Sequence, residues 1–320
     1  MKEIKITDIE NIYIGQAEDA EKATGCTVLI CPDGMAAGLD VRGGGPASRE
    51  SELLKPMANA EYIHAVVLGG GSAFGLDAAG GVMEYMRSKD MGYDVGFTKV
   101  PLVCQSDIFD LGVGDVNAYP DHNMGLESAK AALEGGNYKD GNYGAGCGAT
   151  VGKWNGAATC MKTGIGSYAV QIGELKVGAL VAVNALGDIF DHNTGAKVAG
   201  LLSPDKNSFV STEEEMYKKT EAVDNKFTGN TTIGIIVTNG AFQKSKLCKI
   251  AGMAHNGYAR SIRPVHTTAD GDSIYAVSVG KVNADMDVVG TLAARVMSEA
   301  ILRAVYSADS AYGIVSAKDL

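Results

Sequence analysis

The chain has 320 residues, of which 46% are hydrophobic and 21% charged, and its formal net charge is −10. This composition indicates a globular fold with a large core, and an acidic chain without Lys/Arg clusters makes a poor nucleic-acid binder. Neither a signal peptide nor a run approaching about 18 apolar residues is found, so we expect a cytoplasmic protein that does not span a membrane.

Alternating short apolar runs at residues 26–42, with Pro-Asp-Gly at 32–34, predict a β-hairpin. Farther along, buried strands alternate with amphipathic helices, an order typical of mixed α and β folds. The predicted elements of the first half are a glycine loop at 43–50, a strand at 64–68, a glycine loop at 69–75, a helix at 76–88, a strand and loop at 107–115, and a helix at 124–134.

The second half begins with a glycine-rich segment and an apolar strand that ends at Asn184. Residues 203–229 are polar and charge-mixed, which predicts a mobile surface linker. Order returns with a strand at 230–240, a helix at 243–259, a strand at 272–280 and a helix at 288–308.

The boundary between the linker and the next strand has the sequence Gly229-Asn230-Thr231-Thr232-Ile233. If Thr231 became an N-terminal residue, its α-amine, with a pKa of about 7.7–8, could serve as the base that its hydroxyl needs. The same hydroxyl could first attack the Asn230 carbonyl to form an ester, which water then cuts. Because threonine also favours strands, the motif alone leaves an ordinary strand start open.

Further polar positions could support this chemistry. Lys153 ends a glycine run, where a cation could stabilise an anion or lower the pKa of an amine, or could be a solvated surface group. Asn184 could donate to an oxyanion or cap a turn. Asp270 and Asp272 flank a glycine and could orient an amine or hydroxyl; a plain Asp-Gly turn is the alternative, since an EF-hand calcium loop needs further carboxylates.

The glycine loop at 69–75 fails two familiar motifs, because Phe74 stands where G-x-G-x-x-G and G-x-S-x-G need glycine. We expect the loop to offer close backbone approach and N–H donors, which makes Gly71 and Ser72 candidate substrate-binding residues. The five histidines and six cysteines show no metal spacing, so no metal or other cofactor is predicted, and the histidines are expected to be structural or exposed.

Nine short segments form an ordered set along nearly the whole chain: DVRGGGP (40–46), RE (49–50), GGSAFGLDAA (70–79), FDLG (109–112), GATVGK (148–153), VNA (183–185), NTTI (230–233), RPVHT (263–267) and DGD (270–272). Together they resemble the self-processing P1 aminopeptidases, which include L-aminopeptidase/D-amidase/esterases, β-peptidyl aminopeptidases and nylon-oligomer hydrolases. Each segment alone is unspecific, whereas the complete set in family order is highly specific.

The resemblance implies that the chain, one domain over residues 1–320, cuts itself after Asn230 into pieces 1–230 and 231–320 and exposes Thr231 as the nucleophile. The family fold is α+β, a four-layer αββα sandwich like that of N-terminal-nucleophile hydrolases, and relatives assemble as homo-oligomers. The expected substrates are small peptides or amino-acid amides.

The resemblance also assigns roles to side chains. Lys153 and Asn184 belong beside the nucleophile, and Asp270 and Asp272 form an acidic pair. A threonine after an asparagine resembles the nylon-hydrolase branch, whereas the β-peptidyl branch has a serine nucleophile. Relatives often place a tyrosine near Phe109 as an extra oxyanion donor; phenylalanine lacks the hydroxyl, so Phe109 is a candidate for substrate contact only.

Two other functions fit the same segments. An acyltransferase of the ornithine-acetyltransferase type shares the architecture and also cuts itself before a threonine, but it would pass the acyl group to an amino acid faster than to water. A non-catalytic member that serves in binding or assembly would remain an intact chain of 33.2 kDa.

Overall fold

Ten strands are joined by hydrogen bonds in the computed structural model, which describes residues 1–221 and 229–320. Their order is β1-β11-β12-β15-β17-β3-β5-β8-β4, with β2 paired to β3. The bounds of these strands are β1 Lys2–Ile4, β2 Tyr13–Asp19, β3 Thr24–Val41, β4 Ala47–Arg49, β5 Ile63–Gly69, β8 Val103–Asp107, β11 Ile165–Ile172, β12 Leu175–Asn184, β15 Thr231–Gly240 and β17 Ser273–Val282.

The long strand β3 divides this path into two sheets. Its first part pairs with β2 and β5, and its last part, from Ala36 onward, pairs with β17. The register against β5 shifts between Ile30 and Met35, where Pro-Asp-Gly lies. The predicted hairpin at 26–42 is therefore wrong: the two halves pair with other strands rather than with each other, so the turn residues make an irregularity within one strand.

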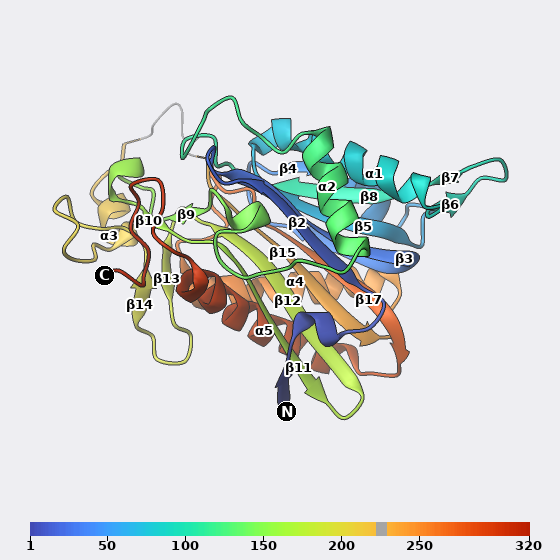
Figure 1. The fold of residues 1–320 in the computed structure, drawn as a ribbon. Helices are drawn as coiled ribbons and strands as arrows, with labels where there is room; N and C mark the ends of the chain where they lie inside the picture. Colours follow the sequence, from blue (N-terminus) through green and yellow to red (C-terminus); the bar gives the residue numbers. More distant parts are fainter. Residues whose placement is uncertain (222–228) are drawn as a thin grey trace.

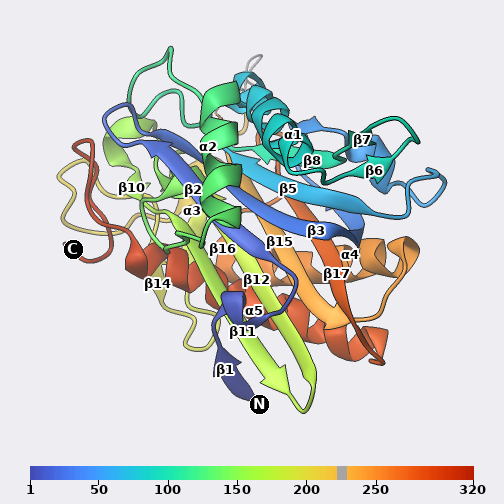
Figure 2. The same ribbon diagram turned by 45° about the vertical axis from the view of Figure 1, so that its right-hand side comes forward.

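Helices cover the outer faces of both sheets, with α1 and α2 on one side and α4 and α5 on the other (Figures 1 and 2). This arrangement confirms the predicted four-layer αββα sandwich. The described helices are α1 Ala78–Ser88, α2 His122–Leu133, α3 Thr212–Tyr217, α4 Lys244–Ser261 and α5 Met286–Ser307. Short strands complete the structure as three small sheets: β6 Tyr93–Asp94 with β7 Lys99–Val100, β9 Thr150–Val151 with β10 Met161–Lys162, and β13 Asp188–Phe190 with β14 Lys197–Ala199 and β16 Ile262–Arg263.

Three buried clusters correspond to the three gaps between the four layers. Along β12, Val181 and Val183 pack in the cluster that includes α4 and α5, whereas Leu180 and Ala182 pack in the cluster between the two sheets. Successive side chains of a strand point to opposite faces, so a strand buried on both faces reads as a continuous apolar run. This is why the run before Asn184 was recognisable in the sequence.

The structure confirms the predicted helices at 76–88, 124–134, 243–259 and 288–308 as α1, α2, α4 and α5, with ends within three residues. Strands β1, β2, β4 and β11 of the large sheet were not predicted, and the strand expected within 107–115 lies earlier in the chain, as β8. The predicted linker contains α3, and residues 222–228 of that linker lie outside the described residues. Among the helices described, none has the length and apolar character needed to cross a bilayer.

Strand directions bring distant segments together at one edge of the sheet. Strand β15 runs parallel to β17, so the starts of both strands meet there. Strand β12 runs antiparallel to β15, so its last residue, Asn184, lies opposite Thr231. The segments around residues 184, 231 and 271 therefore converge although they are far apart in the chain.

Candidate active site

The peptide bond between Asn230 and Thr231 lies at the buried start of β15. The Gly271 N–H donates to the Asn230 carbonyl oxygen at 3.0 Å, and Asn230 forms a parallel bridge with Asp270. The Thr231 hydroxyl also donates to the carbonyl oxygen of Asn230. The hydroxyl and the carbonyl that it would attack are therefore in contact, and a backbone donor is already bonded to that carbonyl.

Lys153 reaches the junction from the loop between β9 and β10. Its Nζ donates to the Gly229 carbonyl at 3.0 Å, and to the carbonyl and side-chain oxygens of Asn184 at 3.0 and 2.8 Å. Burial lowers the pKa of Lys153 to about 7, although negative groups nearby, including Asp270, oppose this shift. A substantial neutral fraction is therefore present near neutral pH, which a solvated surface lysine would not have.

Asn184 has its side-chain amide fixed by hydrogen bonds on both sides. Its Oδ1 accepts from the Thr150 N–H at 3.1 Å as well as from Lys153, and its Nδ2 donates to the Phe109 carbonyl at 3.0 Å. A longer contact of 3.4 Å joins Nδ2 to the Gly229 carbonyl. This amide thus faces the carbonyl one residue before the Asn230 carbonyl.

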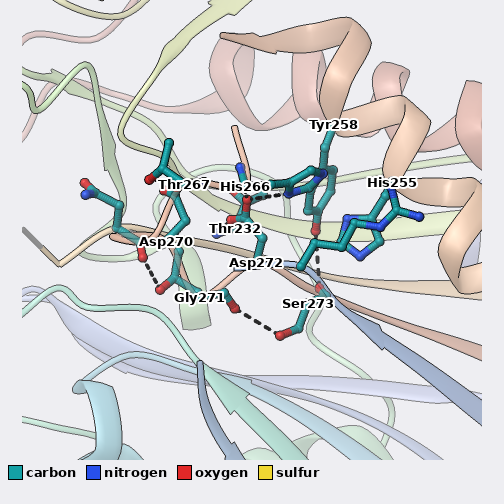
Figure 3. Close-up of polar contacts among 12 residues, drawn as sticks. Thr232, His255, Tyr258, His266, Thr267, Asp270, Gly271, Asp272 and Ser273 are labelled. Atoms are coloured by element: carbon teal, nitrogen blue, oxygen red, sulfur yellow. Dashed lines mark hydrogen bonds and ion pairs between the residues drawn. The ribbon is translucent and has the colours of Figure 1, made fainter. Parts of the chain in front are cut away.

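The acidic pair lies beside Thr267, His266 and Thr232 (Figure 3). Asp270 Oδ2 accepts from the backbone N–H and the hydroxyl of Thr267 at 2.9 and 2.5 Å. Asp272 Oδ1 accepts from the Thr232 N–H at 2.8 Å, and its Oδ2 accepts from His266. Burial raises the pKa of Asp270, and the nearby charge of Asp272 raises it further.

The three predicted substrate-binding residues occupy two different positions. The Phe109 ring packs on Gly229, where a Cβ atom would come within 2.3 Å of that ring. Gly71 and Ser72 contact the segment that carries Phe109 instead: their N–H groups donate to Asp110 Oδ1 at 2.6 Å and to the Ile108 carbonyl at 2.9 Å. Of the three, Phe109 is therefore the one that contacts the junction.

The family model for peptidase family S58 matches residues 5–318. This chain belongs to peptidase family S58. It is 33% identical to an uncharacterized aminopeptidase of Mycobacterium leprae, over 97% of this chain and 92% of the relative. It is 29% identical to a 6-aminohexanoate-oligomer endohydrolase of Agromyces, over 93% and 84% of the two chains. The S58 chain is thus a hydrolase that acts on amide bonds.

Solved structures show the same fold. The L-aminopeptidase D-Ala-esterase/amidase of Ochrobactrum anthropi, described as a variant of the Ntn hydrolase fold, aligns with a TM-score of 0.70 at 18% identity, over 95% of this chain and 86% of that one. A Burkholderia β-aminopeptidase aligns with a TM-score of 0.66 at 18% identity and the same coverage. The S58 chain therefore has an Ntn-hydrolase-type α+β sandwich.

A cavity of about 340 Å³ opens beside the junction. A larger hollow of about 1020 Å³ surrounds Asp33, Tyr62 and Lys281 and contains none of the predicted site residues, so volume alone does not locate the site of this S58 hydrolase. The walls of the smaller cavity are mainly apolar and include Phe109, Val113, Lys153, Trp154, Gly229 and Ile314.

Sequence reasoning missed two side chains near the junction. Asp110 accepts from Gly71 and Thr24, and burial raises its pKa to about 6. His266 was expected to be structural or exposed, but its ring contacts Asp272. Both stand inside motifs of the ordered set, although only the folded chain reveals their partners. Among the residues that the structure describes, no group of three or more acidic, His or Cys side chains could hold a metal ion.

Proposed function

We propose that this S58 hydrolase cuts its own chain between Asn230 and Thr231 and then uses Thr231 as an N-terminal nucleophile on small peptides or amino-acid amides. The observation that carries the proposal is the pair of contacts at the Asn230 carbonyl, one from Gly271 N–H and one from the Thr231 hydroxyl. The aminopeptidase and oligomer-hydrolase names of relatives support the substrate class.

Self-cleavage proceeds in two steps. The Thr231 oxygen attacks the Asn230 carbonyl carbon, its proton passes to a base, and the C–N bond breaks as the Thr231 nitrogen takes up a proton. The product is an ester between Asn230 and the Thr231 side chain, which water hydrolyses to a carboxylate and a free hydroxyl. Gly271 N–H stabilises the negative charge on the oxygen, and Lys153, whose pKa of about 7 leaves part of it neutral, relays the proton.

In turnover the new α-amine of Thr231 acts as the base for its own hydroxyl. Lys153, when charged, lowers the pKa of that amine and favours its neutral form. Asn184 Nδ2, which contacts the Gly229 carbonyl in the uncut chain, becomes a donor to the substrate oxyanion once the upstream piece withdraws. Asp270 and Asp272 orient the amine and the start of β15.

The two pieces stay associated after the cut and work as one domain. In the sheet, β15 and β17 of the piece 231–320 lie between β12 and β3 of the piece 1–230. Separation would break hydrogen bonds on both sides of this pair and expose the apolar faces that α4 and α5 cover, which is strongly unfavourable.

The test is an intact-mass measurement on the purified chain, with N-terminal sequencing and a panel of amino-acid p-nitroanilides. We expect two co-purifying fragments, the smaller beginning Thr-Thr-Ile-Gly, and release of p-nitroaniline. Thr231→Ala should remain a 33.2 kDa chain without turnover, whereas Thr231→Ser should keep some cleavage because serine also has a hydroxyl.

Thr232→Ala is the matched control, because the next hydroxyl along the chain is buried and has no hydrogen-bond partner among the described residues. It should be cut as the parent is. An uncut, inactive parent, or a cut Thr231→Ala variant, contradicts the proposal. Faster transfer to an added amino acid than to water would assign the acyltransferase function instead.

We also propose a cytoplasmic location and a homo-oligomer of the two-piece unit, without nucleic-acid partners. The six free cysteines support the cytoplasmic location, and the acidic charge supports the absence of nucleic-acid partners. The family resemblance supports assembly. Light scattering on the cleaved protein measures the oligomer, and a monomeric mass would contradict that part.

A further inference from the structure

The carboxylate of Asp272 is held by three N–H donors (Figure 3). Oδ1 accepts from the Thr232 N–H at 2.8 Å, while Oδ2 accepts from the backbone N–H of His266 at 3.0 Å and from its ring Nδ1 at 2.9 Å. Asp272 is 1% exposed. A buried carboxylate needs such donors, and here two of the three come from a single residue.

The histidine ring has little freedom to turn away from Asp272. His266 has a left-handed backbone with φ of +60°, and the ring of His255 on α4 packs edge-on against it with centroids 4.7 Å apart. His255 is anchored by a contact of 3.0 Å between its Nε2 and the Asp40 carbonyl. Because the Asp272 carboxylate accepts a hydrogen bond from Nδ1 of His266, that ring nitrogen carries a hydrogen.

Asp272 connects the His266 ring to the nucleophile through its hydrogen bond with the Thr232 N–H. The Thr232 N–H belongs to the peptide group that follows Thr231, so the bond to Asp272 restrains the plane of that peptide and the backbone from which the Thr231 side chain extends. Without the His266 ring, Oδ2 would keep one donor, and the carboxylate could turn toward other donors and release Thr232.

We propose that His266 is a positioning residue for Thr231, acting through Asp272 and the Thr232 N–H. The role rests on the proposed function, since it concerns the alignment of the Thr231 hydroxyl for self-cleavage and turnover. Small misalignments of a reacting group lower rates strongly, by about 10²-fold for a shift near 1 Å.

Two nearly isosteric variants test the role. Asn and Asp both tolerate a left-handed backbone, but the Asn amide can donate to Asp272 whereas the Asp carboxylate repels it. We expect His266→Asn to retain at least about a third of the self-cleavage rate and of kcat. His266→Asp should lose about 10²-fold in both with KM unchanged, because binding of substrate is not the step affected.

A third variant, His266→Gly, suits the positive φ and removes the ring donor without adding charge. We expect its self-cleavage rate and kcat to fall by about tenfold. It replaces His266→Asp as the test if the His266→Asp chain does not fold. His122→Asp is the control, because it places the same substitution at a surface contact of 2.8 Å with Glu84. It should behave as the parent does.

Equal rates for the parent and all His266 variants would overturn the positioning role. So would equal losses in His266→Asn and His266→Asp that track a lower melting temperature, since the ring would then be only structural. The parent, measured in parallel, separates this from the proposed function: an uncut parent refutes both, whereas a cut parent with unaffected variants refutes the positioning role alone.

Discussion

The two flanks of the Asn230–Thr231 bond are held in opposite ways. Upstream, the chain is held through a carbonyl: Gly229 accepts from Lys153 at 3.0 Å. Downstream, it is held through an N–H: Thr232 donates to Asp272 at 2.8 Å. The upstream partner is a long side chain from a loop, and the downstream partner is a short carboxylate directly before the central strand β17.

This difference indicates that the two partners have different roles. The short, buried Asp272 holds the backbone in place, because its oxygens accept from the Thr232 N–H and from the backbone N–H and ring of His266. Lys153 has a flexible stem, and burial lowers its pKa to about 7, so it can release its carbonyl partners and move a proton. We therefore expect substitutions upstream to affect proton transfer and substitutions downstream to affect alignment.

Lys153→Met gives the largest effect expected from this comparison. It keeps the apolar stem but removes the ammonium, so self-cleavage should slow by roughly 10²–10⁴-fold, the range for loss of an acid–base group. Lys153→Arg should not restore the rate, because guanidinium stays charged. The rate is measured as the disappearance of intact chain by mass.

Lys162→Met is the matched control for that prediction. Lys162 is also buried with a pKa lowered by burial to about 7, but its Nζ contacts the carbonyls of Gly146 and Ala149 at 3.0 and 3.2 Å rather than the junction. A folded Lys162→Met chain should still cut itself. Equal slowing in both variants would mean that a buried lysine at either position serves the fold and not the reaction.

A smaller effect is expected from Gly271→Ala on the downstream side. A Cβ atom there would lie 2.8 Å from the Thr231 hydroxyl and 2.9 Å from the Gly45 carbonyl, so both the hydroxyl and the backbone at Gly45 must shift. We expect self-cleavage and kcat to fall by about tenfold with little change in KM. Single-turnover rates would measure this, and a changed KM with constant kcat would place the methyl group in the substrate pocket instead.

The smallest expected effect is on stability. The pKa of Lys153 falls from 10.5 to about 7 on folding, so the folded chain binds this proton more weakly than the unfolded chain does. The charged lysine therefore destabilises the fold fully below pH 7, and this destabilisation disappears as pH rises from 7 to 10.5. In the uncut Thr231→Ala background, Lys153→Met should raise Tm more at about pH 6 than at about pH 9. An equal shift at both would show that the ammonium is solvated.

Local patterns in the sequence predicted individual strands and helices, whereas the resemblance to a known family implied the four-layer sandwich and the cut between Asn230 and Thr231. Strands buried on both faces read as continuous apolar runs, and long helices show their period, so β12, β15, α4 and α5 were predictable. The predicted polar linker ends at Gly229, directly before the strand that carries Thr231, and the family resemblance placed Lys153 and Asn184 beside that residue.

Only the tertiary structure decided which groups the polar residues around the junction contact. Pro-Asp-Gly at 32–34 has the local chemistry of a hairpin turn, but pairing of β3 with β5 and β17 overrode it. His266 looked like an ordinary histidine until the loop before β17 brought it to Asp272. Which backbone group each polar side chain holds depends on strand order and direction, and these follow from burial of whole faces rather than from any short stretch of sequence.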